Sequence, residues 1–162
     1  MFDVPDPTLR EALTAALAVD RWVDEVASAA PFESFPAFLA FASEAASPLS
    51  EIEIRQAIAH HPRIGERPQG DGTAAALSRA EQASLGDDDE AVNLQIAQGN
   101  VAYERVFDRV FLIRAAGRTR AEILAELNRR LLLDDETELD IVGGQLREIA
   151  LLRLETLLGE YA

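Results

Sequence analysis

Residues 119–131 read TRAEILAELNRRL, and the pattern in this stretch decides the fold class. Thr119 and Glu122 have the spacing of a capping box, in which two side chains bind the free backbone N–H groups at a helix start. Apolar residues then recur at the spacing of one helical face, as Ile123, Leu124, Leu127 and Leu131. The stretch therefore predicts an amphipathic helix with one face in a core.

Helical signals continue on both sides of this stretch. Ala, Leu, Glu and Arg dominate the chain, and alternating β-branched residues are nearly missing, which favours helices. The helices predicted before it cover residues 7–19, 20–29, 35–46, 50–60, 77–85 and 89–108. A last helix follows a polar turn at 134–138 and directs Leu146, Ile149, Ala150 and Leu157 to the core. We predict an all-α protein, a single compact bundle-like domain of about seven to eight helices over residues 1–162.

Three details of these helices are open to direct test. Asp6 before Pro7 has the composition of an N-cap followed by a first-turn proline. One face of the 89–108 helix is marked by Leu94, Ala97 and Val101. Gly143-Gly144 weakens the last helix and predicts a break or a kink there.

Two segments depart from the helical pattern. The stretch after His61 contains Pro62, Gly65, Pro68, Gly70 and Gly72, which predicts an irregular loop over residues 62–73. Residues 110–113 are the one extended-looking segment of the chain. Such a segment leaves backbone groups without intrahelical partners, and these can bind a planar ligand rich in amides. The commoner use of such a segment is as a connector that crosses the core.

The charge balance restricts the possible partners. Lys and Arg number 15 against 29 Asp and Glu, which gives a net charge of −14 and argues against nucleic acid and anionic membrane surfaces. An anionic substrate would meet an unfavourable overall field, so Arg or His groups must offset that field at the pocket. No apolar run is long enough to span a membrane, and the N-terminus lacks the layout of a signal peptide. With no cysteine, these features fit a cytoplasmic protein.

His60 and His61 are the only histidines, and they stand where a helix ends and the loop begins. Histidine changes charge near neutral pH, and loop residues on a rigid scaffold often carry function, so His61 is a candidate acid–base group. The alternative is a histidine that only ends a helix, where a cation suits the helix dipole. Adjacent histidines point in different directions and no metal-binding spacing occurs, so we expect no metal site.

Ser78 and Glu81 allow two interpretations. Ser-x-x-Glu is a capping-box pattern, in which Ser78 would begin a helix and Glu81 would reach back to it. The functional interpretation makes Glu81 the carboxylate partner of His61. Both roles are compatible if the helix start faces the pocket, where its free N–H groups would also receive an anion.

Arg153 falls in phase with the apolar stripe of the last helix. A buried guanidinium is costly without a partner, so it calls for a carboxylate from the protein or from a ligand. A structural ion pair or a side chain that reaches the solvent from the core edge explains it equally well.

Together these segments resemble the 2-oxo-4-hydroxy-4-carboxy-5-ureidoimidazoline (OHCU) decarboxylase family. The matching features run in family order along nearly the whole chain: Arg21-Trp22-Val23, Pro31-Phe32, His61-Pro62-Arg63-Ile64-Gly65-Glu66, Ser78-x-x-Glu81-Gln82, Asn100-x-x-Tyr103, Phe107, Phe111-Leu112-Ile113, Gly117 and Leu152-Arg153-Leu154. A lone His-Pro would be weak evidence, whereas the ordered series is specific. The sequence departs from the family at Asp108, where many relatives have Gly, at Ala18-Val19, which lacks a frequent cysteine, and at Gly143-Gly144.

The resemblance implies a compact all-helical homodimer without a cofactor. Its small-molecule substrate would be the ureidoimidazoline of urate catabolism, decarboxylated to (S)-allantoin and CO2. The resemblance makes His61 the catalytic histidine and Glu81 the carboxylate that orients it. It assigns substrate contacts to Pro62, Ser78, Gln82, Phe111, Leu112, Ile113, Arg114, Ala115 and Arg153.

The implied chemistry leaves the role of Arg153 open. Tight binding of the departing carboxylate would stabilise the ground state, so Arg153 either anchors a carbonyl or ureido oxygen or holds the carboxylate out of the ring plane. Two rival interpretations remain, a non-enzymatic helical interaction module and a lyase or hydrolase that acts on a related heterocycle. A cavity shared by His61, Glu81 and Arg153 would argue against the interaction module.

Overall fold

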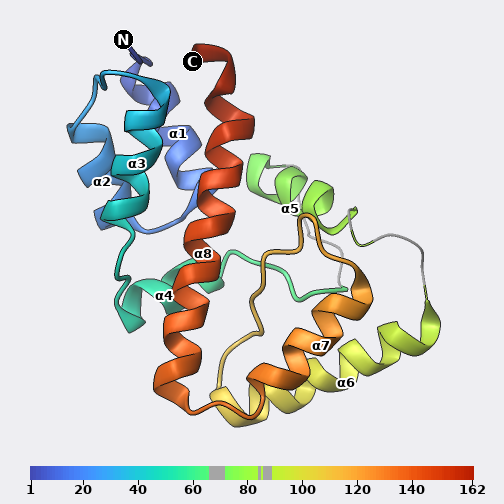
Figure 1. Ribbon diagram of the computed structural model, residues 1–162. Coiled ribbons are helices and arrows are strands. Elements are labelled where there is room, and N and C mark those ends of the chain that lie inside the picture. The colour runs from blue at the N-terminus through green and yellow to red at the C-terminus, as the bar shows by residue number, and fades with distance from the viewer. Residues whose placement is uncertain (66–71, 84, 86–88) are drawn as a thin grey trace. The chain divides into compact units, whose positions relative to one another are not determined.

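The computed structural model describes residues 1–65, 72–83, 85 and 89–162 and consists of helices joined by short connections (Figure 1). In chain order these are α1 (Asp6–Ala16), α2 (Asp20–Ser28), α3 (Phe35–Ala45), α4 (Glu51–Ile58), α5 (Thr73–Ala83), α6 (Glu90–Phe107), α7 (Arg120–Arg130), α8 (Asp135–Leu158) and a 3-10 turn, η1 (Gly159–Tyr161). No strand forms among the described residues, and an isolated antiparallel bridge pairs Phe2 with Phe32. The all-α prediction is therefore confirmed.

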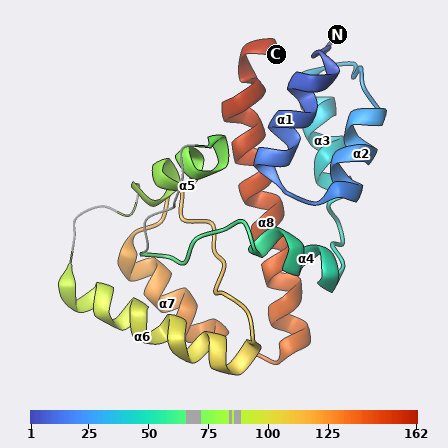
Figure 2. The same ribbon diagram turned by 180° about the vertical axis from the view of Figure 1, so that it is seen from behind.

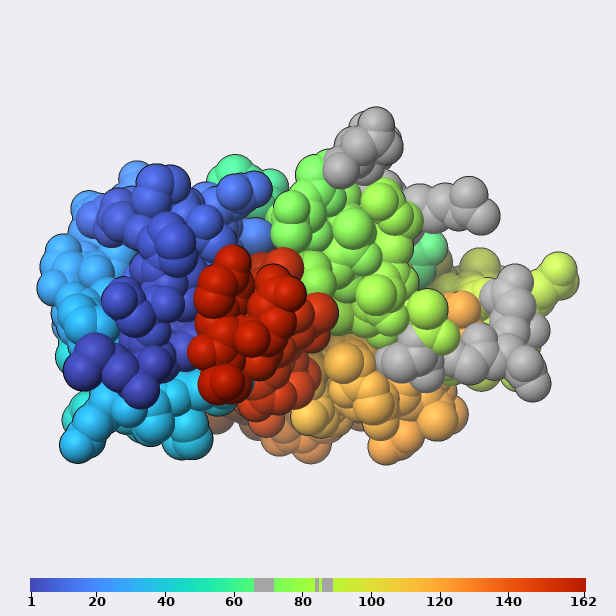
Figure 3. Space-filling view, turned by 90° about the horizontal axis from the view of Figure 1, so that it is seen from above, coloured from blue at the N-terminus to red at the C-terminus, as the bar shows by residue number. Residues whose placement is uncertain are grey.

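The chain forms two compact units. The first contains Met1–Ala57 and Gly143–Ala162, and the second contains Ile58–Val142. In the first unit, α1, α2 and α3 lie beside the C-terminal part of α8, as the opposite views of Figures 1 and 2 both show. From above, the last turns of α8, in red, lie against the N-terminal residues, in blue (Figure 3). A single domain over residues 1–162 stays a prediction.

Aromatic packing and one buried hydrogen bond hold the first unit together. The Phe2 ring stacks on Phe38 with 4.7 Å between the ring centroids. Trp22 is fully buried on α2, and its indole N–H donates to the Ala42 carbonyl of α3 at 2.9 Å. Next to it, Arg21 forms an ion pair with Glu53 of α4 at 2.7 Å, and this guanidinium lowers the pKa of the Glu53 carboxyl. Each half of the Arg21-Trp22 pair thus ties α2 to a different helix.

In the second unit, α6 and α7 lie side by side (Figures 1 and 2). Gly99 of α6 allows this close approach, because a Cβ at that position would lie 2.4 Å from the Leu127 Cδ2 atom of α7. The predicted capping box is confirmed, with Thr119 and Glu122 bonded reciprocally at the start of α7. Ile123 and Leu127 are fully buried in the predicted stripe.

The buried face of α6 differs from the predicted one. Leu94 and Val101 are 59% and 50% exposed, whereas Ile96, Tyr103 and Phe107 are buried. Both sets fit a helical period, so the spacing alone could not choose between them. Burying the face with two aromatic rings removes more apolar surface from water.

Asp108 ends α6 in the left-handed conformation, with φ 54° and ψ 38°. Its N–H donates to the Glu104 carbonyl at 2.9 Å and closes the last turn. Glycine adopts this conformation without a Cβ penalty, and Asp tolerates it better than most residues. The geometry explains why this sequence can depart from glycine at that position.

Residues 134–138 are not the polar turn that was predicted. α8 begins at Asp135, and the Asp134 carboxylate accepts from the Thr137 N–H at 2.7 Å, as an N-cap does. No break occurs at Gly143-Gly144, because α8 continues without interruption from Asp135 to Leu158, and the alternative of a kink there stays a prediction. Packing on one face can outweigh the intrinsic cost of two glycines in a helix.

The prediction that Asp6 caps α1 is wrong by one residue. Pro5 occupies the cap position without a side-chain bond, and Asp6 is already helical. Its carboxylate instead accepts from Arg10 one turn later at 3.1 Å. The helix also ends at Ala16, before the predicted boundary at residue 19.

Candidate active site

His61 lies just beyond α4 and begins the candidate site. Its backbone N–H donates to the Ile58 carbonyl at 2.9 Å, which closes the last turn of the helix. His61 is half-buried, while the adjacent His60 is exposed. Of the two histidines, His61 has the more enclosed environment.

The segment that follows His61 is anchored at three points. Arg63 forms an ion pair with Glu104 of α6 at 2.7 Å, and Asn100 of α6 donates to the Ile64 carbonyl at 3.1 Å. The Gly65 N–H donates to the Gln82 side-chain oxygen of α5 at 3.2 Å. Contacts from two helices therefore position the chain directly after His61 and Pro62. Residues 66–71 of the predicted loop lie outside the described residues.

α5 presents three of the predicted site residues on one face. Ser78, Glu81 and Gln82 are spaced three and four residues apart, so their side chains are neighbours on the helix. Ser78 is buried, and the other two are half-buried. The capping-box interpretation of Ser78 is wrong, because α5 begins five residues earlier at Thr73 and not at residue 77. Among the described residues no helix therefore begins beside Ser78, which removes the reason for expecting an anion there.

Residues 110–115 form a non-helical connection between α6 and α7, as predicted. Phe111, Leu112 and Ile113 are all buried. Two carbonyls of the segment accept hydrogen bonds from arginines: Leu112 from Arg130 at 2.8 Å and Arg114 from Arg118 at 2.9 Å. The connector and ligand-binding interpretations are compatible, because a buried segment with side-chain anchors can do both.

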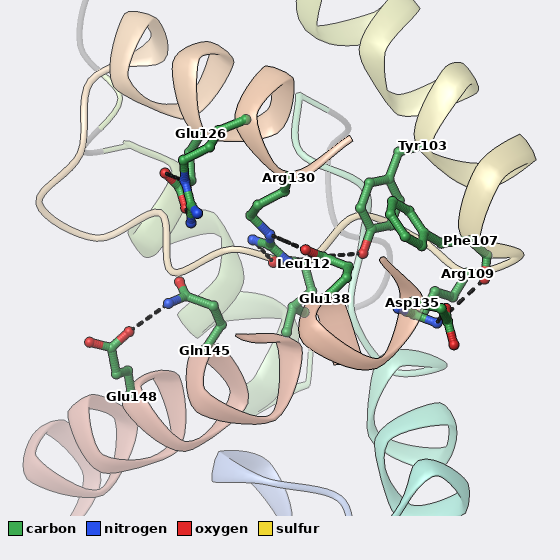
Figure 4. Close-up of polar contacts among 11 residues, drawn as sticks. Tyr103, Phe107, Arg109, Leu112, Glu126, Arg130, Asp135, Glu138, Gln145 and Glu148 are labelled. Atoms are coloured by element: carbon green, nitrogen blue, oxygen red, sulfur yellow. Dashed lines mark hydrogen bonds and ion pairs between the residues drawn. The ribbon is translucent and has the colours of Figure 1, made fainter. Parts of the chain in front are cut away.

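A buried polar network supports this segment (Figure 4). Arg130 donates to both carboxylate oxygens of Glu138, and the Tyr103 hydroxyl donates to the same carboxylate at 2.6 Å. All three residues are 0% exposed. The Arg130 guanidinium also lies 4.6 Å from the centroid of the Phe111 ring. Burial, and then the bond to Glu138, raise the pKa of Tyr103.

The sequence pattern does not predict this network. It places Glu138 in a turn, includes Tyr103 only in the family motif and gives Arg130 no role. One signal was available, since Arg130 follows the buried Leu127 by three residues and therefore shares its helical face.

Arg153 is buried on α8, as its phase with the apolar stripe predicts. Its Nη1 atom donates to the Ala15 carbonyl of α1 at 2.9 Å, so a backbone oxygen accepts this bond where a carboxylate was expected. Arg153 belongs to the first unit, and the other predicted site residues belong to the second. The cavity that His61, Glu81 and Arg153 were expected to share stays a prediction.

A polar pocket of about 840 Å³ lies in the second unit. Its lining consists of Arg63, Ile64, Gly65, Asn93, Ile96, Ala97, Asn100, Val101, Glu104 and Arg120. None of the predicted site residues lines it, so it gives no support to their assignment. Among the described residues, no cluster of His, Asp and Glu side chains has the geometry of a metal site, and no helix is both long and apolar enough to cross a bilayer.

The arrangement of helices defines the fold. It matches a crystal structure of OHCU decarboxylase in the presence of (S)-allantoin with a TM-score of 0.79, over 92% of this chain and 98% of that one. The two sequences are 22% identical, so this match establishes a shared fold alone. The model of the OHCU decarboxylase family matches residues 3–155. The chain therefore belongs to the OHCU decarboxylase family.

Two curated relatives are similar over part of their length. The mouse 2-oxo-4-hydroxy-4-carboxy-5-ureidoimidazoline decarboxylase is 36% identical over 106 residues, which cover 63% of this chain and 58% of the mouse protein. The Arabidopsis thaliana uric acid degradation bifunctional protein TTL is 34% identical over 110 residues, which cover 66% of this chain and 34% of that protein. The match thus spans less than two thirds of either relative.

Proposed function

We propose that this protein decarboxylates 2-oxo-4-hydroxy-4-carboxy-5-ureidoimidazoline to (S)-allantoin and CO2 in urate catabolism. The observation that carries the proposal is the family match over residues 3–155, a range that includes His61, Glu81 and Arg153. The mouse relative is named for this reaction, and the Arabidopsis relative for uric acid degradation.

His61 is the proposed acid–base residue. When the bond between the ring carbon and the carboxylate breaks, CO2 leaves and the electron pair passes to a neighbouring carbonyl or imine of the ring. The hydroxyl on the carbon that lost CO2 then gives up its proton and becomes a carbonyl, and His61 delivers a proton to one face of the neighbouring ureido-bearing carbon, which gives a product of one hand. Glu81 orients the imidazole and favours its protonated form. The reaction needs no external electron sink in this scheme, because the ring itself accepts the pair.

The remaining site residues bind the substrate in this proposal. Ser78 and Gln82 share the α5 face with Glu81, Pro62 restrains the chain after His61, and the backbone of residues 111–115 binds the amide edge of the ring. Arg153 supplies positive charge that offsets the net charge of −14. It either anchors a carbonyl or ureido oxygen or holds the carboxylate out of the ring plane, because tight binding of the departing carboxylate in the ground state would slow its loss.

The handedness of the product tests the proposal. OHCU also decays without a catalyst, to racemic allantoin. Freshly prepared OHCU with the protein should lose CO2 faster than the uncatalysed control and give optically active allantoin. Racemic product at the uncatalysed rate would rule out the reaction, and it would favour an interaction module or a different heterocyclic substrate.

Two neighbouring variants test the role of His61. His61→Ala should lower turnover by about 100-fold or more, the usual size of an acid–base contribution. His60→Ala is the matched control, because this histidine is exposed and adjacent and has no proposed role, and its turnover should stay within about twofold. Far-ultraviolet circular dichroism verifies that both variants fold. Wild-type turnover in a folded His61→Ala protein would remove His61 from the mechanism.

We further propose that the protein is a homodimer and acts in the cytoplasm. The homodimer follows from the family resemblance, and the cytoplasm from the lack of cysteine, which suits a reducing compartment. Light scattering on a size-exclusion column should give twice the mass of one chain. A monomer at working concentration would contradict the proposal.

A further inference from the structure

Arginine side chains hold one edge of the 110–115 segment. Arg130 donates a hydrogen bond to the Leu112 carbonyl, and Arg118 donates one to the Arg114 carbonyl two residues later. In an extended chain, the backbone groups of alternate residues point to the same side. In the extended segment that the sequence predicts here, the arginines would occupy the edge of residues 112 and 114 and leave the opposite edge to Ile113.

The backbone of Ile113 differs from that of its neighbours. Ile113 is 3% exposed, and within the part of the chain that the structure describes neither its N–H nor its C=O makes a hydrogen bond. Buried backbone groups nearly always have a partner. One donor and one acceptor side by side suit a cyclic amide or urea, which presents an N–H and a C=O along one edge.

Several hydrogen bonds hold the Arg130 guanidinium in one orientation. Three bonds join its Nε and Nη2 atoms to Glu138, at 2.9, 3.1 and 2.5 Å, and leave Nη1 for the Leu112 carbonyl. Tyr103 holds the carboxylate from its other side, and the Phe111 ring covers the guanidinium. Because a guanidinium is planar, fixing two of its nitrogens also fixes the direction of the third.

We propose that Arg130 is a positioning residue for substrate binding. By holding the Leu112 carbonyl, it turns the Ile113 N–H and C=O toward the amide edge of the ureidoimidazoline ring. Glu138 and Tyr103 act through Arg130 and do not touch the substrate. This inference rests on the proposed function. It identifies the Ile113 backbone as the part of the segment that binds the ring, and Arg130 as the residue that holds that backbone in place.

A double substitution tests the proposal while sparing the fold. Removing Arg130 alone would leave the Glu138 carboxylate buried without its cation, whereas Arg130→Met with Glu138→Leu replaces the pair by apolar groups of similar size. We expect the folded double variant to show a KM raised tenfold or more, with kcat within about threefold. A purely structural role would lower the fraction of active protein, and hence the apparent kcat, without changing KM.

Arg109→Met is the matched control. Arg109 is also buried in the second unit and forms an ion pair, here with the exposed Asp135. Arg109 also donates to the Phe107 carbonyl, which lies outside the 110–115 segment. The KM of this variant should stay within about twofold of the wild type.

Nuclear magnetic resonance adds a direct readout at Ile113. Adding (S)-allantoin should shift the Ile113 amide resonance in the wild type and in Arg109→Met, and the double variant should need about tenfold more ligand for the same shift. A folded double variant with wild-type KM and a wild-type Ile113 response would overturn the proposal. If the double variant does not fold, Arg130→Lys decides: a raised KM supports the positioning role, and an unchanged KM or failure to fold assigns Arg130 to folding alone.

The outcomes separate this inference from the proposed function. If the wild type does not accelerate OHCU decay, both are overturned before any variant is compared. If the wild type is active and the folded double variant binds as tightly, the positioning role alone is overturned.

Discussion

The phenol of Tyr103 is fully buried, and this burial changes its pKa. Its hydroxyl donates to Glu138 at 2.6 Å, and burial followed by this bond raises the pKa of Tyr103 above the ordinary value of 10.0. Between pH 10 and the folded-state pKa, the unfolded chain binds fewer protons than the native protein. This contribution to the free energy of unfolding is therefore complete below about pH 10 and is lost as the pH rises above it.

A variant with one tyrosine tests this sign. The chain has two tyrosines, so Tyr161→Phe leaves Tyr103 as the only phenol. Its near-ultraviolet phenolate absorbance should rise only well above pH 10, and urea titrations should show stability falling over the same range. When Tyr103→Phe is added to Tyr161→Phe, this fall in the free energy of unfolding above pH 10 should disappear. Ionisation at about pH 10 in a folded protein would contradict the buried hydrogen bond.

Two glycines inside helices have opposite environments, and the packing of each helix decides what alanine would do there. On α6, a Cβ at Gly99 would lie 2.4 Å from Leu127, which is itself fully buried and cannot move aside cheaply. On α8, a Cβ at Gly144 would meet nothing nearer than an Arg147 nitrogen at 3.8 Å. Gly99 allows the close contact between α6 and α7, whereas Gly144 makes no such contact and only lowers the stability of α8.

Alanine substitutions should therefore change stability in opposite directions. Gly144→Ala should stabilise the protein by roughly 0.5–1 kcal/mol, because alanine loses less backbone entropy in a helix. That corresponds to a rise in Tm of about 1–4 °C. Gly99→Ala should cost about 1–3 kcal/mol through overpacking. Thermal unfolding measured side by side compares the two, and equal shifts of the same sign would contradict the close approach of α6 and α7.

At the scale of the whole molecule, the charge of −14 sets a field that an anionic substrate must cross. The screening length falls from about 30 Å at 0.01 M salt to about 8 Å at 0.15 M. If the net field governs substrate capture, KM should fall by roughly twofold or more over this range while kcat stays constant. Replacing the salt by sucrose should leave KM unchanged. A KM that rises with salt would show that positive groups near the bound substrate outweigh the net charge.

The part of the fold that could be predicted depends on short-range interactions. The Thr119–Glu122 capping box and the stripe that holds Ile123 and Leu127 form where the sequence predicts them. Caps and apolar spacing act within one or two helical turns, so they can be predicted without knowing which helix packs against them. Arg153 is buried for the same reason, since its phase within one helix is a local property.

The part that could not be predicted depends on which helices meet. Leu94 and Ile96 lie on alternative faces of α6 with equally good periodicity, and contact with the rest of the core selected the face of Ile96. Ser78 has the pattern of a cap yet lies inside α5, because the helix starts at Thr73. In both cases a local pattern allowed two structures, and packing chose one.

By itself, the sequence determined the helical class, most helix boundaries to within a few residues, a non-helical segment at 110–113 and the membership of a family. Tertiary structure alone decided that Arg130, Glu138 and Tyr103 form one buried network behind that connection. The physical reason is distance along the chain: Tyr103 and Glu138 are 35 residues apart, and no local pattern records that their helices bring them within 2.6 Å. Burying a charge costs free energy unless the fold places a partner beside it, and the position of that partner depends on the complete tertiary structure.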